Sequence, residues 1–199
     1  MEAITNSATF LISSLGTLYV LAVLLRFLLQ IAHADFYNPL SQAVVRITNP
    51  LVKIFRTFIP GYKGIDFPIL ILAFVLEAAA LCSLVLLYGG SIPSIATIVT
   101  LTLAGIVLFI INIYFYAIIA SIVMSWIMMF SGSTNPHPIL HLIWQLTEPV
   151  MAPIRKIIPP MGGLDISPIF VFLGLQLVRG FVEASFGISG VERVLLLGI

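Results

Sequence analysis

A repeat with an offset of 99 residues is the feature that most constrains how this chain can fold. The pattern T-x-P-x5-R-x3-P-x3-G-x-D occurs twice in the same register. Its two copies are Thr48, Pro50, Arg56, Pro60, Gly64 and Asp66, and Thr147, Pro149, Arg155, Pro159, Gly163 and Asp165. Each copy lies between two long apolar runs, so we interpret the chain as two tandem membrane units, residues 1–90 and 91–199.

The composition is typical of an integral membrane protein. Apolar residues make up 60% of the chain and charged residues only 9%, whereas soluble domains carry about 25% charged residues. A net charge of +1 provides no basic surface for nucleic acid. Because Cys82 is the only cysteine, an intramolecular disulfide is excluded.

Four apolar runs are long enough for transmembrane helices, which need about 20 residues. They cover residues 8–31, 67–88, 95–130 and 168–186. The third run is longer than one perpendicular span needs, so we expect one long, tilted helix. The sequence therefore predicts an all-α membrane protein with four transmembrane helices, arranged as two tandem two-helix repeats of parallel topology.

The connector inside each repeat has the pattern of an amphipathic helix. Apolar residues recur at steps of three and four, and Thr-x-Pro fits the end of one short helix and the start of another. Lysine and arginine are concentrated in these connectors, so the positive-inside rule predicts that both are cytoplasmic and that both termini face outward. The connectors could lie in the membrane interface or re-enter the membrane, and the sequence leaves both options open.

Polar residues inside the spans are candidates for function because each is costly there. The expected pairs are Arg26 with Glu77, at similar depth; their counterparts Ser125 with Gln176, at the 99-residue offset; and Arg179 with Glu183, at i,i+4 spacing. For Arg26 and Glu77, both a structural clamp between helices and a proton or cation relay fit. Arg179 could also pair with Glu77, and for Arg179 the alternatives are pairing for stability and contact with a substrate.

Asp66 and Asp165 each precede a span, where a carboxylate meets the positive end of the helix dipole. Each follows an arginine of the connector by ten residues, so we expect Arg56–Asp66 and Arg155–Asp165 ion pairs. Arg155 and Lys156 are also a candidate surface for lipid head groups or a partner. We recognise no catalytic motif and no metal-ligand set, so we expect neither enzymatic activity nor a cofactor.

The second copy reads T-E-P-V-M-A-P-I-R-K-I-I-P-P-M-G-G-L-D-I-S-P from Thr147 to Pro168, with Glu148 inside the motif. This resembles the signature of the YggT family, also called YlmG in other bacteria and in plastids. The first copy is a diverged match with Asn49 in place of the glutamate. The resemblance implies a small inner-membrane protein of Gram-negative bacteria, linked to tolerance of osmotic or extracytoplasmic stress. Relatives are linked to cell division, nucleoid distribution and cytochrome complex assembly.

Two functions remain open at this point. The first is a scaffold or assembly factor whose connectors bind lipid or a partner, such as a membrane or cell-division protein. The second is an oligomeric cation channel or transporter near the interface between the repeats. Intramembrane charge is scarce and can be paired, and the polar residues of the third run form no continuous stripe, which favours the scaffold.

Overall fold

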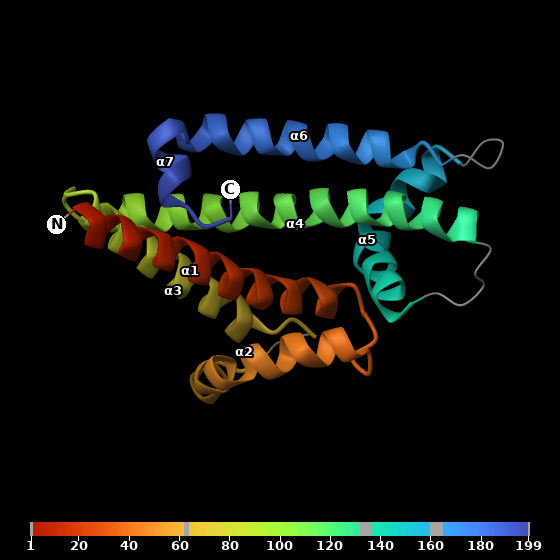
Figure 1. Ribbon diagram of the computed structural model, residues 1–199, viewed down its shortest axis with the longest axis horizontal. Coiled ribbons are helices and arrows are strands. Elements are labelled where there is room, and N and C mark those ends of the chain that lie inside the picture. The colour runs from red at the N-terminus through yellow and green to blue at the C-terminus, as the bar shows by residue number, and fades with distance from the viewer. Residues whose placement is uncertain (1, 62–63, 132–136, 160–164, 199) are drawn as a thin grey trace.

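The computed structural model describes residues 2–61, 64–131, 137–159 and 165–198, and nearly all of them are helical. The helices are α1 (Glu2–Ile31), α2 (Pro39–Phe58), α3 (Phe67–Leu87), α4 (Ile95–Ser131), α5 (Pro138–Ile157), α6 (Ser167–Phe186) and α7 (Gly190–Leu195) (Figure 1). Helices α1, α3, α4 and α6 are long and apolar enough to cross a membrane. The chain is therefore a multi-pass membrane protein.

The four spans lie where the apolar runs predicted them. Helix α4 is continuous over 37 residues, as expected for the third run. Helix α1 begins at Glu2 rather than at residue 8. The polar residues before the apolar run extend the helix, because a helix satisfies its backbone hydrogen bonds internally. This holds both in lipid and outside it.

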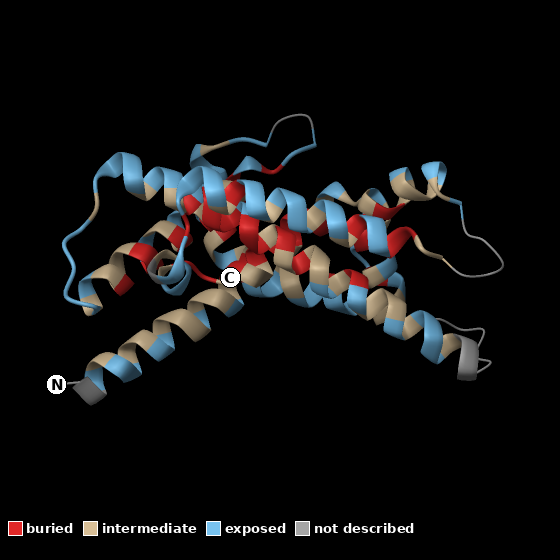
Figure 2. Ribbon diagram, turned by 90° about the horizontal axis from the view of Figure 1, so that it is seen from above, coloured by how far each residue is buried: buried red, intermediate tan, exposed pale blue. Residues whose placement is uncertain are grey.

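The core forms where α1, α3 and α4 pack together, and buried residues follow the middle of this bundle (Figure 2). Leu24 of α1, Leu72 of α3 and Phe109 of α4 are among its buried side chains. Helix α6 packs on α4 and α5, and its outer face leaves Leu177 and Phe181 exposed. An exposed apolar face is expected on a span, because lipid tails are as apolar as the side chains.

The connectors α2 and α5 are single helices, which corrects the expectation of two short helices divided at Thr-x-Pro. Helix α2 continues through Pro50, and α5 continues through Pro149 and Pro153. A proline removes one backbone hydrogen bond and bends a helix, but the bonds on either side maintain it. The direction of α2 accordingly changes between its first and second halves (Figure 1).

The C-terminal residues form a structured segment that the sequence analysis did not predict. Helix α6 ends at Gly187, whose φ of 64° is the left-handed conformation common after helices. After α7 the chain returns to α4 (Figure 1), and Leu196 and Leu197 are only 4% and 2% exposed. The end of the described chain is thus packed inside the helical bundle.

Candidate functional site

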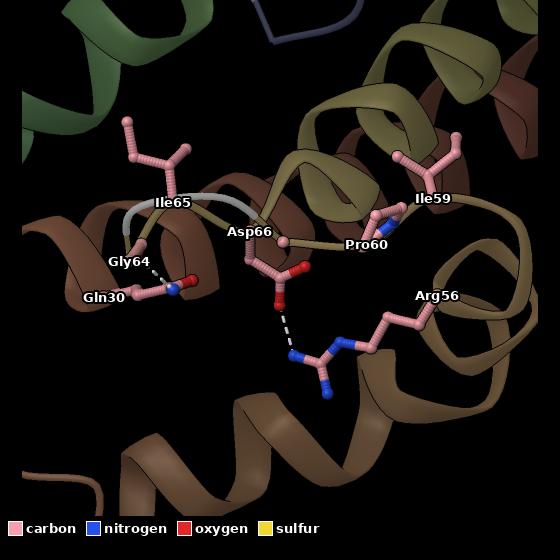
Figure 3. A pocket seen from close by; sticks show the side chains of 8 residues that line it. Gln30, Arg56, Ile59, Pro60, Gly64, Ile65 and Asp66 are labelled. Carbon is pink, nitrogen blue, oxygen red and sulfur yellow. Dashed lines mark hydrogen bonds and ion pairs between the residues drawn. The ribbon is translucent and has the colours of Figure 1, made fainter.

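Ion pairs join each connector to the start of the following span. In the first copy Arg56 Nη2 contacts Asp66 Oδ2, at the edge of a cavity of about 380 Å³ (Figure 3). In the second copy Arg155 Nε donates to Asp165 Oδ2 at 2.9 Å, and Arg155 Nη1 donates to Glu148 Oε2 at 2.7 Å. The structure therefore contains both expected arginine–aspartate pairs, and the second arginine has an additional carboxylate partner.

Asp165 is held in its charged form by hydrogen bonds. Burial alone would raise the pKa of Asp165, but hydrogen bonds from Ser167 and Arg155 outweigh this and keep the pKa below its ordinary value. One of them comes from Ser167 N, which donates to Asp165 Oδ1 at 2.9 Å at the N-terminus of α6. Arg155 is paired with two carboxylates, whereas Lys156 is exposed. Lys156 is therefore the cation of the predicted Arg155–Lys156 surface that is more accessible to a lipid head group or a partner.

Within the described part of the chain, Arg26 and Glu77 do not form the expected ion pair. Arg26 is 6% exposed, and its Nη1 donates to Thr48 Oγ1 at 2.8 Å, which ties α1 to α2. Glu77 instead accepts a hydrogen bond at Oε1 from Leu197 N, at 2.8 Å. The two residues were matched by depth alone, and depth does not tell which face of each helix a residue occupies.

The predicted counterparts Ser125 and Gln176 are not brought together either. Ser125 lines a cavity between α4 and α5, whereas Gln176 lies on the exposed surface of α6. The corresponding positions of the two copies thus have different surroundings, because α3 is covered by α4 and α7, while no described residue covers the outer face of α6.

A chain of polar contacts connects α4, α6, α7 and the C-terminal segment. Arg179 Nε donates to Glu183 Oε1 at 3.0 Å, the contact expected from i,i+4 spacing. Arg179 Nη1 also donates to Asn112 Oδ1 at 3.0 Å, and Asn112 Nδ2 donates to Gly198 O at 2.7 Å. At the other end Arg193 Nη2 donates to Glu183 Oε2 at 2.7 Å. Asn112 of α4 thus joins α6 to the C-terminal segment.

The C-terminal segment fits closely into this site. A Cβ at Gly198, whose φ is +72°, would lie 2.5 Å from ring carbons of Phe109. A Cβ at Gly105 would lie 3.0 Å from Glu77 Oε1. The close approach of the C-terminal backbone to Phe109 therefore depends on glycine at position 198, and Gly105 leaves little space beside Glu77. Within the described residues, Glu77 Oε2 is buried without a hydrogen-bond partner.

Gly64, a further motif residue, lies shortly before α3. Gly64 has a φ of +82°, and its carbonyl oxygen accepts a hydrogen bond from Gln30 Nε2 at 2.8 Å (Figure 3). Pro60 and Pro159 follow the ends of α2 and α5, while Gly163 lies outside the described residues. In the described ranges no group of three or more His, Cys, Asp or Glu side chains is placed to hold a metal ion.

One sequence signal for the C-terminal segment was available and was missed. Ser189 and Glu192 have the spacing of a capping box. In the structure Ser189 N donates to Glu192 Oε2 at 3.1 Å and Ser189 Oγ donates to the same oxygen at 2.9 Å. A hydrogen bond from its own backbone N–H, together with those from Ser189, lowers the pKa of Glu192. The signal predicts a helix start, but not where that helix packs.

Comparison with known proteins connects this architecture to one family. The family model described as CCB3/YggT matches the chain twice, over residues 5–87 and 100–186. A protein of Pseudomonas aeruginosa is 40% identical over 179 residues, which cover 89% of each chain. The YggT protein of Escherichia coli K12 is 34% identical over 176 residues, which cover 87% of this chain and 88% of that protein. No solved structure matches the chain. Because the family model and the relatives span most of the sequence, the chain belongs to the CCB3/YggT family.

Proposed function

We propose that this protein is a non-enzymatic scaffold of the bacterial inner membrane, with the connector helices α2 and α5 as its cytoplasmic docking surface. The role that its family resemblance suggests for such a scaffold is in tolerance of osmotic or extracytoplasmic stress. The observation that carries the proposal is that the two connectors are joined to each other and to the spans as one unit.

Direct hydrogen bonds link the two connector regions, which contain α2 and α5. Asn38 Nδ2 donates to Pro138 O at 2.7 Å, so the first turns of α2 and α5 lie side by side. Asp35 N donates to Gln145 Oε1 at 3.1 Å. Together with the arginine–aspartate pairs, these bonds hold α2 and α5 in one orientation relative to the bundle. A docking surface benefits from such preorganisation, because less freedom is lost on binding.

The free face of α2 has the chemistry of a membrane-surface docking site. Its exposed apolar residues, at steps of seven and four, are Leu40, Ile47, Ile54 and Phe58. Arg46 and Lys53 are exposed on the same helix. An apolar stripe with neighbouring cations fits the interface between anionic head groups and a membrane-bound partner protein.

The test uses exposed cations that make no ion pair among the described residues. A triple variant, Arg46→Glu, Lys53→Glu and Lys156→Glu, is compared with the matched Arg46→Lys, Lys53→Arg and Lys156→Arg variant. Each is expressed in cells that lack the protein, and survival of hyperosmotic shock is measured with membrane levels checked. We expect the charge-reversed variant to accumulate without restoring survival, and the charge-retaining variant to restore it. Full survival with the charge-reversed variant would reject α2 and α5 as the docking surface.

Orientation is tested separately. Each connector region contains a lysine suited to labelling, Lys63 in the first copy and Lys156 in the second. Lys156 is exposed, and Lys63 lies outside the described residues. A Lys156→Cys variant should react with an impermeant thiol reagent only after the cells are opened, because the positive-inside rule places α5 in the cytoplasm. Reaction in intact cells would contradict the proposed topology.

A cation path is the second candidate function. The observation in its favour is the buried carboxylate of Glu77 within the polar contacts of the spans, with one oxygen lacking a partner among the described residues. Against it, the buried side chains of Leu196 and Leu197 fill the same region. Ion flux into proteoliposomes that contain only this protein, abolished by Glu77→Gln, would favour transport over the scaffold.

A further inference from the structure

We infer that the cavity between α4 and α5 is a binding site for an organic cation with N–H donors on an apolar chain, such as an alkylguanidinium or a primary alkylammonium. The cavity measures about 350 Å³, which lies within the range of about 300–1,000 Å³ for ligand pockets. Its polar lining includes Ser121 and Ser125 of α4 and Thr147 and Arg155 of α5. Met124 and Leu140 supply apolar surface for a chain.

The first copy shows what occupies the corresponding space there. Arg26 and Thr48 precede Ser125 and Thr147 by 99 residues each. In the first copy the guanidinium of Arg26 is buried and donates to Thr48 Oγ1 at 2.8 Å. In the second copy Ser125 occupies the position of the arginine, and Ser125 and Thr147 both line the cavity. The second copy therefore has a space where the first copy places its own guanidinium.

The hydroxyl groups of the cavity are oriented as acceptors. Ser121 Oγ donates to Ile118 O at 2.8 Å, and Ser125 Oγ donates to Ser121 O at 2.9 Å. Thr147 Oγ1 donates to Ile143 O at 3.0 Å. Because a hydroxyl has one proton, each of these oxygens offers only lone pairs to the cavity. Thr48 in the first copy has the same orientation: its Oγ1 donates to Val44 O and accepts a hydrogen bond from Arg26 Nη1. A ligand must therefore bring the N–H groups.

The charges near the cavity also favour a cation. Arg155 is paired with both Glu148 and Asp165, so two carboxylates face one cation. The first copy differs at two of these positions. It has the neutral Asn49 where the second copy has Glu148, and it has the cation Arg26 where the second copy has Ser125. Since Arg155 lines the cavity but is already paired with two carboxylates, it leaves no unpaired positive charge there to attract an anion.

An aromatic wall completes the site. Trp144 and His141 both line the cavity, and their ring centroids are 6.2 Å apart. Guanidinium and ammonium groups are attracted to the face of a tryptophan ring. Trp144 also makes binding observable, because the chain contains only two tryptophans.

Binding is tested with the full chain in phosphatidylcholine nanodiscs, in which no lipid head group carries an N–H donor. A Trp126→Phe background leaves Trp144 as the only tryptophan of the chain, and a scaffold protein without tryptophan is used. We expect octylguanidinium to change the Trp144 emission saturably, and octanoate, an anion with the same chain length, to have no saturable effect. Equal responses to the two amphiphiles would overturn the proposal.

Variants then locate the site. Thr147→Val removes one acceptor and should weaken octylguanidinium binding by about tenfold to a hundredfold, the effect of one hydrogen bond to a charged group. The matched variant Thr48→Val, in the first copy, should leave binding unchanged. Ser125→Arg should fill the cavity with its own guanidinium and abolish the response. Unchanged binding in both Thr147→Val and Ser125→Arg would overturn the proposal, even if one of them folded poorly.

The lipid composition of the nanodiscs is then varied to distinguish a lipid head group from a soluble cation as the natural ligand. Phosphatidylethanolamine carries a primary ammonium, so adding it to the nanodiscs should weaken octylguanidinium binding if the site takes a lipid head group. If binding is unchanged by this lipid and is instead weakened by a soluble alkylamine, the ligand is a soluble cation. Failure of both to compete would contradict an ammonium ligand and limit the site to guanidinium compounds.

Discussion

The hydrogen bond between Glu77 and Leu197 predicts how the C-terminal segment can be released from the bundle. Glu77→Leu removes the acceptor that lies 2.8 Å from Leu197 N, while this N–H remains in a buried position. A buried donor without a partner costs about 1–3 kcal/mol. The ratio of released to packed segment should therefore rise about 5- to 150-fold. Glu77→Gln retains an acceptor oxygen and should raise this ratio much less.

The assay is the rate of cysteine labelling at a buried position of the segment. Cys82→Ala removes the only native cysteine, and Leu196→Cys introduces a reporter that is shielded while the segment is packed. If packing and release are fast relative to labelling, the rate follows the released population. We expect the fastest labelling with Glu77→Leu, slower labelling with Glu77→Gln and the slowest with Glu77.

A control corrects the labelling rates for reagent access. Ser91→Cys, in the exposed loop between α3 and α4, should label at the same rate in all three backgrounds. If Leu196→Cys also labels equally in all three, the Glu77–Leu197 bond does not hold the segment, and the reasoning fails.

Arg26 and Thr48 should be energetically coupled, because the hydrogen bond between them joins a buried charge to a buried hydroxyl. In thermal unfolding, the double variant Arg26→Met/Thr48→Val should lose less stability than the sum of the losses in the two single variants. Losses that simply add would contradict the contact. Hydrogen bonds in the folded chain lower the pKa of Asp165, so its contribution to stability is present above the pKa of an unfolded aspartate and lost as the pH falls through the folded value. The stability difference between the protein and Asp165→Asn should thus shrink on acidification, and a constant difference would argue against this linkage. Gly198→Ala should release the C-terminal segment because its Cβ would collide with Phe109; an unchanged melting temperature and Leu196→Cys labelling rate would refute the close fit.

The spans and part of the candidate site could be predicted because their signals are local. An apolar run of sufficient length predicts a span without knowledge of its neighbours. The Arg56–Asp66 and Arg155–Asp165 pairs join residues ten positions apart in the sequence, and Arg179 and Glu183 lie on one helix face. Short separations limit the geometry enough for residue spacing to predict contact.

The partners of Arg26 and Glu77 could not be predicted in the same way. The partner of Arg26 lies 22 residues away in sequence, and that of Glu77 lies 120 residues away. The position of a residue along a span indicates its depth, but the rotation of the helix depends on which faces pack together. Arg26 consequently faces α2 and Glu77 faces the C-terminal segment, although their depths are similar.

The sequence by itself determined the class of this protein, the number and positions of its spans, and its family. Only the tertiary structure decided that residues 196–198 pack between the helices and meet Glu77 and Asn112. The groups that make these contacts are the N–H of Leu197 and the carbonyl of Gly198, and every non-proline residue carries the same two groups. No residue pattern marks them, and their need for a partner arises only once the segment is buried away from water.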